Sequence, residues 1–506
     1  MESERQPLLS IGDEVPGAEN QSHSLTNNLS KGPFSSFVAD EADIGPINGV
    51  QDFFRELLVE SKKLWYLAGP AVFTSLCQYS LGAITQTFAG HVGNLELAAV
   101  SVENSVIAGF SFGIMLGMGS ALETLCGQAY GKGELDMLGI YMQRSWVILN
   151  TTALICSVFY IFATPLLKLI GQTTAISDAA GTFALWMLPQ LFAYAMNFPI
   201  AKFLQAQSKI IAMALISGVA LVLHALFSWL LMLKLGWGLV GGAVVLNASW
   251  WFIVVAQLMY IFGGACGRAW TGFSWKAFQN LSGFVQLSIA SAVMLCLEVW
   301  YFMALILFAG YLKNAEFAVD SLSICMNILG WTLMVAFGFN AAVSVRVSNE
   351  LGAAHPRTAK FSVVGATMNS FSVGLILSLI LVIFRGEYPS LFSGSTEVKD
   401  AVYQLTPLLA VTIIIDNVQP VLSGVAVGAG WQAYVAYVNV GCYYVFGIPL
   451  GLVLGYKIGL GVKGIWLGML LGTVVQTLVL SLMIYKTDWK KEASKAGDRI
   501  RQWGLP

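Results

Sequence analysis

The sequence predicts an all-α integral membrane protein with 12 transmembrane helices arranged in two six-helix lobes. Three observations lead to this prediction: the composition, the length of the apolar segments and an internal repeat. Of the 506 residues, 57% are hydrophobic and 11% are charged, whereas soluble proteins carry about 25% charged residues. The apolar residues also form runs of roughly 18 or more, which is the length that crosses a bilayer. The net charge of −1 indicates no general attraction to nucleic acid.

The first 58 residues are expected to form a disordered cytoplasmic tail and a surface helix. The tail is polar and has no basic segment followed by an apolar one, so a cleaved signal peptide is not expected. Within it, Glu4, Leu8 and Leu9 fit an acidic dileucine sorting signal, which makes a sorting adaptor a candidate partner. Residues 51–63 are expected to form a short amphipathic helix on the membrane surface.

Six apolar spans are expected in a first lobe (59–270) and six in a second lobe (271–486), followed by a cytoplasmic tail (487–506). The spans of the first lobe are expected at 64–89, 97–121, 145–170, 181–205, 210–235 and 238–263. Those of the second lobe are expected at 283–309, 317–343, 361–384, 402–427, 434–456 and 461–485.

The distribution of positive charge predicts the orientation. An even number of spans places both termini on the same side of the membrane. When each Lys or Arg inside a span is counted with the nearer span end, the side of the termini and of the loops after even-numbered spans has 20 Lys and Arg residues, and the other side has 7. Cytoplasmic segments are enriched in Lys and Arg, so both termini are predicted to be cytoplasmic.

The two halves of the chain repeat. Phe88–Ser101 aligns with Phe308–Ser321 at a shift of 220, and seven of the fourteen positions are identical. Because each half has an even number of spans, the halves share one orientation. Transporters with such parallel repeats place the substrate path between the halves, and a monomer is expected to be sufficient.

Five acidic residues fall within or at the ends of apolar spans: Glu103, Glu123, Glu298, Asp320 and Asp416. A carboxylate inside the membrane costs several kcal/mol unless it is paired, hydrated or protonated, so such residues are candidates for function.

Glu298 lies in the middle of the seventh span. Its neighbours three and four positions away are apolar or aromatic and cannot neutralise it. We therefore expect Glu298 to load and release a proton, although a carboxyl satisfied by a neighbouring helix is the structural alternative. The repeat places Gln78, which cannot titrate, at the equivalent position of the first lobe. Proton coupling is thus expected in the second lobe.

Asp416 precedes Pro420 by one helical turn in the tenth span. Proline has no N–H, so the carbonyl of residue 416 loses its helical partner and a kink is expected there. A kink, a free carbonyl and a carboxyl at one level suit a gated polar site. The alternative is an acid that stabilises an interrupted helix.

The other polar residues in the spans have structural interpretations. Glu123 is expected to anchor the cytoplasmic end of its span, Asp320 to cap the eighth span, and Glu103 can simply face the lipid headgroups. His224 resembles a hydrogen-bonded core histidine more than a proton relay. The functional roles of Glu103, Glu123 and His224 stay open.

No cofactor, metal or enzymatic site is expected. The seven cysteines are scattered through apolar runs, and the four histidines do not cluster. Residues 459–464 match the glycine pattern of dinucleotide-binding proteins, but they join two apolar spans and follow no strand. No nucleophile–base arrangement occurs.

Five segments resemble the plant branch of the multidrug and toxic compound extrusion (MATE, or DETOXIFICATION) family. They are Gly119–Gly131, Val293–Trp300, Ala318–Met326, Arg346–Gly352 and Gln419–Ala426. The resemblance covers about 60–490 and keeps the order of the motifs.

This resemblance implies a V-shaped, two-lobed transporter that works by alternating access and uses a proton gradient. It also implies that an acid on span 7 and an acid on span 10 form the proton-coupling pair, and Glu298 and Asp416 occupy those positions. Several relatives have Asn at the second position, so Asp416 favours retained coupling. Relatives have an uncharged residue at the position of Glu103. Family members carry flavonoids, alkaloids, organic acids, hormones or halides, and some conduct chloride.

We therefore expect a proton-coupled antiporter that exports organic solutes from the cytosol into the vacuole. The alternative is a vacuolar chloride or anion channel, or a uniporter, with the same fold. The vacuolar membrane is the favoured location and the plasma membrane the second. The expected partners are protons, a small organic or anionic solute and the bilayer. The substrate cavity is expected to include Gln78, Tyr301, Asn327, Asn340, Asn417 and Gln419, with Pro420 as the gating position.

Overall fold

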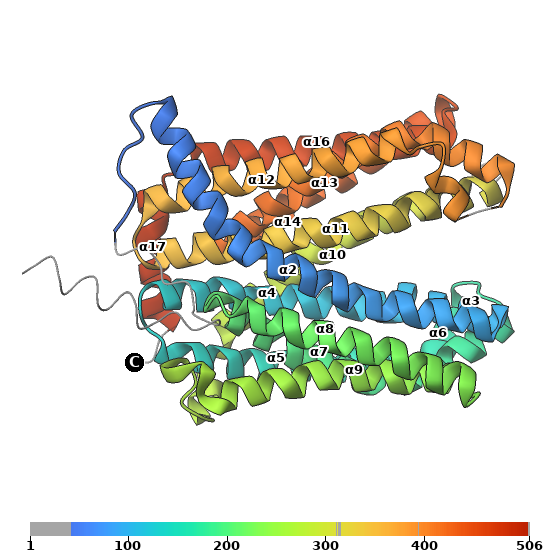
Figure 1. The fold of residues 1–506 in the computed structure, drawn as a ribbon, viewed down its shortest axis with the longest axis horizontal. Coiled ribbons are helices and arrows are strands. Elements are labelled where there is room, and N and C mark those ends of the chain that lie inside the picture. Colours follow the sequence, from blue (N-terminus) through green and yellow to red (C-terminus); the bar gives the residue numbers. More distant parts are fainter. Residues whose placement is uncertain (1–41, 310, 312–314, 393, 504–506) are drawn as a thin grey trace, which may run out of the picture.

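The computed structural model describes residues 42–309, 311, 315–392 and 394–503. The predicted sorting signal of Glu4, Leu8 and Leu9 lies outside these residues. The described part of the chain is helical and contains no strand. Figure 1 shows two layers of long, roughly parallel helices, with α2 running diagonally from one layer to the other.

The first lobe contains α2 (Val50–Val92), α3 (Asn94–Val102), η1 (Glu103–Ala108), α4 (Gly109–Gly131), α5 (Asp136–Ile161), α6 (Ala163–Leu169), α7 (Thr174–Ala206), α8 (Ile210–Ser228), η2 (Trp229–Lys234), α9 (Gly238–Tyr260) and η3 (Ile261–Ala265). The short elements η4 (Gly267–Ala269) and η5 (Trp275–Phe278) lead to the second lobe.

The second lobe contains α10 (Leu281–Ala309), α11 (Ala315–Gly352), α12 (Pro356–Ile383), η6 (Tyr388–Leu391), α13 (Thr396–Ala429), α14 (Gln432–Asn439), η7 (Val440–Gly447), α15 (Ile448–Leu452), η8 (Val453–Lys457) and α16 (Gly461–Lys486). The amphipathic helix α17 (Trp489–Trp503) follows.

Ten helical segments of the described chain are long and apolar enough to cross a membrane. Two further predicted spans correspond to α2 and α7, which have 43 and 33 residues but are less apolar. Both helices carry amide side chains, such as Gln78 on α2 and Gln190 on α7, that line an internal cavity. Their lower hydropathy therefore reflects a polar inner face, and with them the fold has the predicted 12 spans.

The prediction of a separate surface helix at 51–63 is wrong, because α2 is one continuous helix from Val50 to Val92. At 1.5 Å per residue its length is about 65 Å, twice the thickness of the hydrocarbon layer. Glu60, in the supposed surface segment, is buried against Arg346 of α11 and Ser362 of α12. These partners compensate the charge, so the polar start of α2 packs against protein.

The two lobes meet mainly where α2 and α4 pack against α10 and α11. The beginning of α2 belongs to the second lobe, since Leu64, Leu67, Ala68 and Ala71 share a buried core with residues of α11, α12 and α13. The end of α2 packs instead against α3, α8 and α9 of the first lobe. One helix is thus shared between the two lobes.

The internal repeat is visible in the backbone. Gly236 precedes α9 and Gly238 begins it, with φ values of 68° and 55°. Gly459 precedes α16 and Gly461 begins it, with φ values of 82° and 61°. These left-handed conformations suit glycine because it lacks a Cβ. Equivalent loops therefore make the same turn in each lobe. The dinucleotide-like pattern at 459–464 covers the end of such a loop and the first turn of α16.

Glycines bring the lobes into direct contact at one end. A methyl group on Gly131 would overlap the backbone of Asn349, and one on Gly352 would overlap the backbone of Gln128. Small residues allow helix backbones to approach this closely. We call this contact between the ends of α4 and α11 the glycine seam.

Both described chain ends lie at the same end of the helical bundle as the glycine seam. The Asp43 carboxylate accepts a hydrogen bond of 2.8 Å from the backbone N–H of Thr358, at the start of α12. At the other end of the chain, Arg499 of α17 donates a 2.9 Å hydrogen bond to Gln128 of α4. The two ends thus lie on the same side of the helical bundle, as an even number of spans requires (Figure 1).

Candidate functional site

A cavity of about 530 Å³ lies between the lobes. Its walls come mainly from α2, α4 and α7 of the first lobe and from α10, α11 and α13 of the second. The aromatic lining residues are Tyr79, Phe112, Tyr194, Phe198, Trp250, Trp331 and Phe337. The amide lining residues are Gln78, Gln86, Asn104, Gln190, Asn197, Gln205, Asn327 and Asn340.

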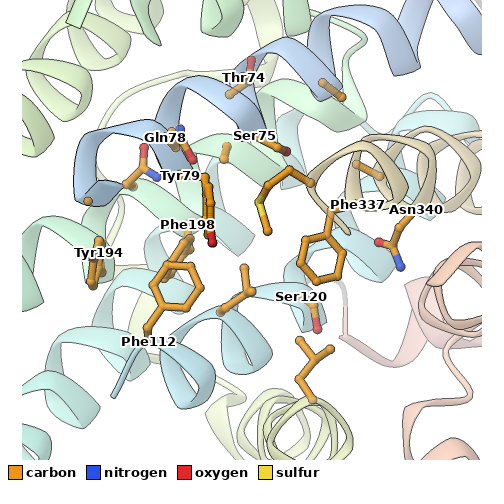
Figure 2. A pocket seen from close by; sticks show the side chains of 18 of the residues that line it. Thr74, Ser75, Gln78, Tyr79, Phe112, Ser120, Tyr194, Phe198, Phe337 and Asn340 are labelled. Atoms are coloured by element: carbon orange, nitrogen blue, oxygen red, sulfur yellow. The ribbon is translucent and has the colours of Figure 1, made fainter. Parts of the chain in front are cut away.

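Figure 2 shows how opposite walls face each other across this cavity. Tyr194 and Phe198, one turn apart on α7, stack with ring centroids 5.6 Å apart, and Phe112 of α4 meets both rings edge-on. Trp250 of α9 packs behind Tyr194 at 4.7 Å. This aromatic wall is fixed by ring packing, and it offers flat apolar surfaces to a bound molecule.

The cavity contains one ion pair, between Glu123 of α4 and Lys202 of α7, with an Nζ–Oε2 distance of 2.7 Å. The two charges compensate each other, so they add no net charge to the lining. The amide groups supply hydrogen-bond donors and acceptors without charge. The described lining therefore suits a largely apolar, aromatic molecule with several neutral polar groups.

The six predicted cavity residues divide into two groups. Gln78, Asn327 and Asn340 line the cavity, and Asn340 also donates a 2.6 Å hydrogen bond to the carbonyl of Pro420. Tyr301, Asn417 and Gln419 do not line it and are buried within the second lobe. Residues of the second group face their own lobe because they lie on the inner sides of α10 and α13.

Glu298 of α10 and Asp416 of α13 come together inside the second lobe, away from the cavity wall. Their charges repel each other, and Gln419 lies within hydrogen-bonding reach of Glu298. One oxygen of each carboxyl, Oε2 of Glu298 and Oδ2 of Asp416, is buried without a hydrogen-bond partner. Among the described residues, no Lys or Arg forms an ion pair with either carboxyl. We call these two residues the carboxyl pair.

Two stacked tyrosines cover the carboxyl pair. The rings of Tyr301 and Tyr443 are 4.2 Å apart and nearly parallel, and both interact electrostatically with Asp416. Tyr301 donates a 2.5 Å hydrogen bond to the carbonyl of Met469 on α16. The hydroxyl of Tyr443 is buried without a partner. Tyr443 therefore has an unused polar group beside two carboxyls.

Helix α13 is continuous through Pro420. Side chains of neighbouring helices bind carbonyls along it, as Ser370 does at Asn417 and Asn340 at Pro420. Asn417 also donates from its side chain to the carbonyl of Ile413. These contacts hold α13 together around its prolines, and a gating role for Pro420 stays a prediction.

The predicted positions of Glu103 and Asp320 are wrong. Glu103 does not face headgroups: it is 0% exposed and begins the π-helical turn η1, which turns it toward α5 and α7. Asp320 does not cap the eighth span, because α11 begins at Ala315 and Asp320 is an exposed residue within it. A carboxylate near the start of a helix is favourable there because of the helix dipole.

His224 matches a hydrogen-bonded core histidine. Its Nε2 lies 3.0 Å from Oγ1 of Thr85, and its Nδ1 lies 2.9 Å from Oγ of Ser249. The imidazole thus joins α2, α8 and α9. All seven cysteines are buried and free, and the described residues contain no cluster of metal-ligating side chains.

Sequence reasoning missed Tyr443, Tyr194 and a hydrogen bond of 3.1 Å between Gln476 and Asn439. The side chain of Asn439 also donates a hydrogen bond to the carbonyl of Met294 on α10. All are polar side chains within apolar spans, which is a detectable signal. Their neighbours depend on helix packing, however, and spacing alone does not reveal which of them face one another.

Comparison with known proteins finds the same architecture in one family. The MatE family model matches residues 70–230 and 290–453. The chain is 68% identical over 464 residues to Protein DETOXIFICATION 32 of Arabidopsis thaliana, covering 92% of this chain and 90% of that protein. It is 70% identical over 462 residues to Protein DETOXIFICATION 29 of the same plant, covering 91% and 92%.

Solved structures agree with these sequence matches. The crystal structure of the eukaryotic MATE transporter AtDTX14 superimposes with a TM-score of 0.84 at 35% identity, covering 88% of this chain and 99% of that one. The bent form of the Vibrio cholerae MATE transporter VcmN superimposes with a TM-score of 0.74 at 19% identity, covering 87% and 99%. The second match supports the fold alone.

Proposed function

Because the chain belongs to the MatE family of membrane transporters, we propose that it is a proton-coupled antiporter that exports organic solutes from the cytosol. The family consists of transporters and not of enzymes. We further propose that the vacuole receives the solute and that both termini are cytoplasmic, with the positive-inside distribution in support.

The observation that carries the proposal is the carboxyl pair. Two mutually repelling carboxyls inside the membrane, without a basic partner among the described residues, are unfavourable when both are ionised. A shared proton relieves this repulsion. A change of pH on one side of the membrane changes the fraction of molecules in which the pair is protonated. The pair thus has the physical properties of a proton-loading site.

A transporter of this kind would alternate between two arrangements of its lobes. Proton binding and solute transport are coupled if these two arrangements differ in their affinity for the proton. Helices α10 and α13 carry the carboxyl pair, and they also supply Met294, Leu295, Ser423 and Val427 to the cavity wall. If protonation changes the packing of α10 and α13, the cavity wall changes as well, and with it the affinity for the solute. Reciprocally, a bound solute changes the affinity for the proton.

The energy available is sufficient for accumulation. A gradient of two pH units supplies about 2.7 kcal/mol per proton, which supports roughly a hundredfold concentration of solute. The solute class follows from the lining: aromatic walls, many neutral amides and a self-compensated ion pair favour flat, uncharged and polyhydroxylated molecules. A flavonoid glycoside has these features.

The experiment is transport by the purified full-length protein in liposomes, with and without a pH gradient. We expect uptake of a flavonoid glycoside to require the gradient and to be lost in Glu298→Gln. Asp400→Asn, which removes an exposed acid at the start of α13, is the matched control and retains uptake. Gradient-driven uptake by Glu298→Gln at the wild-type level would contradict the proposal.

The alternative function, passive anion conduction, has one observation in its favour: Lys202 and several amide donors line the cavity. Chloride flux that persists after collapse of the pH gradient, without effect of organic solutes, would support this alternative. The two functions are therefore separated within one set of liposomes.

A further inference from the structure

Glu103 is a second buried carboxyl that the proposed function does not use. It lies in the first lobe, at the start of η1, with its side chain 0% exposed. Neither of its carboxyl oxygens has a hydrogen-bond partner. A buried ionised carboxylate without partners is strongly unfavourable, so this environment suits the neutral, protonated carboxyl.

The surroundings of Glu103 contain hydroxyl groups and no cation. Tyr160 of α5 and Tyr194 of α7 are the titratable groups that interact with it electrostatically, and Cys156 lies beside Tyr160. No Lys, Arg or His of the described residues acts on Glu103. The hydroxyls of Tyr160 and Ser111 are also buried and lie within hydrogen-bonding reach of each other. None of these hydroxyls donates a hydrogen bond to the carboxyl, so no described neighbour stabilises its ionised form.

The backbone at Glu103 is unusual. Residues 103–108 form a π-helical turn between α3 and α4, a conformation that is rare and frequent at functional sites. A Cβ on Gly109 would lie 2.9 Å from the carbonyl oxygen of Asn104. Glycine at 109 thus leaves room for the close approach that the π-turn makes.

Glu103 lies behind the cavity wall, next to a residue that lines it. Its neighbour Asn104 lines the cavity, whereas Glu103 does not. Successive residues of an α-helix differ by about 100° around the axis. If the π-turn rewinds to α-helix, the residues before the turn rotate by about 100° relative to the residues after it. This rotation would carry Glu103 toward the direction in which Asn104 now points. Tyr194, which interacts with Glu103 and lines the cavity, stands between the two environments.

We propose that Glu103 is a proton-binding site of the first lobe, separate from the carboxyl pair, which holds its proton behind the cavity in the π-turn conformation and releases it toward the cavity when the turn rewinds. This site extends the proposed transport function but does not depend on it, because proton binding can be measured without solute. The carboxyl takes its proton from solvent water and returns it to solvent water through the cavity, and no other side chain binds it.

The test is infrared difference spectroscopy of the purified full-length protein in lipid, recorded while the pH is changed. We expect a carbonyl-stretch signal of a protonated carboxylic acid that remains in the Glu298→Gln/Asp416→Asn variant and disappears in Glu103→Gln. Glu96→Gln, which removes a half-exposed acid from α3 of the same span, is the matched control and retains the signal.

Gly109→Ala tests the backbone part of the proposal. The added methyl group disfavours the π-turn, so the Glu103 signal should exchange its proton for deuterium faster than in the wild type. If Glu103→Gln does not fold, Glu103→Asp, which keeps a titratable group, should retain a shifted signal. Three results would overturn the proposal. The carbonyl-stretch signal could remain in Glu103→Gln, it could respond to sodium concentration instead of pH, or the wild type could show no such signal. Failure of solute transport in the liposome assay would leave this result unaffected.

Discussion

Arg346 on α11 binds both carboxylate oxygens of Glu60 on α2, through hydrogen bonds of 2.9 and 3.1 Å. The same guanidinium donates a 2.6 Å hydrogen bond to Glu350, which also contacts His355. All three charged side chains are 5% exposed or less. This buried network joins the beginning of α2 to the second lobe.

Arg346→Met should destabilise the protein by about 3–5 kcal/mol, because it takes the guanidinium away from two buried carboxylates and leaves Glu350 with His355 alone. The thermal unfolding midpoint of the purified protein measures this effect. Arg268→Met is the matched control, since Arg268 forms an exposed ion pair with Asp136 at 2.8 Å, and it should leave the midpoint unchanged. Equal midpoints for the two variants would show that the network does not hold α2 in place.

The two stacked tyrosines should respond differently to removal of the hydroxyl. Tyr301→Phe removes the shorter of two side-chain hydrogen bonds to the carbonyl of Met469, leaving only the 3.4 Å bond from Thr473, and should cost about 1–2 kcal/mol of stability. Tyr443→Phe removes a hydroxyl that has no partner and should cost nothing measurable. The same thermal measurement compares the variants, and a larger loss for Tyr443→Phe would contradict the assignment of these bonds.

Gly131→Ala should weaken the glycine seam. The added methyl group overlaps the backbone of Asn349, and such overpacking costs about 1–3 kcal/mol. The lobes should therefore separate more often at this end, which raises hydrogen–deuterium exchange of the backbone at the end of α4. Gly441→Ala, where no atom lies within 4 Å of the new methyl group, is the control. Unchanged exchange in Gly131→Ala would mean that the lobes do not close there.

The cavity ion pair should control charge selectivity. Glu123→Gln leaves Lys202 as an uncompensated cation in the cavity wall, so affinity for anionic solutes should rise by at least ~1 kcal/mol, roughly fivefold. Lys202→Gln should have the opposite effect. The double variant should return to wild-type selectivity, because its lining again carries no net charge. Competition binding with a neutral and an anionic form of one aromatic solute measures the change.

The sequence was sufficient to predict the membrane architecture, because long apolar runs and the repeat depend on local composition. The MatE family membership and the 12-span fold agree with that prediction. The pairing of Glu298 with Asp416 came from the family resemblance and is compatible with their positions in the structure, while their role in proton coupling stays a proposal.

The remaining features depend on how helices turn and pack. The burial of Glu103 requires the π-turn at 103–108, which rotates the side chain in a way that α-helical spacing does not indicate. The burial of Glu60 requires Arg346, which is 286 residues away in the chain. Tyr301 and Asn417 point into their own lobe because of packing against Tyr443 and Gly374. Such long-range contacts leave no periodic pattern in the sequence.

The shared helix α2 also restricts how the molecule can change shape. Its beginning is tied to one bundle and its end to the other, so rigid rotation of either bundle must stretch or bend the segment between them. Pro70 lies at the second-lobe end of that segment, next to Ala71, the last residue of α2 in the second-lobe core. A Cβ added at Gly69 would contact no atom within 4 Å, and Thr74 donates a hydrogen bond to the carbonyl of Pro70. Deformation should concentrate at this locally weakened turn. In the proposed transport cycle, α2 would bend at this turn, and the energy of that bend would contribute to the barrier between the two arrangements of the lobes.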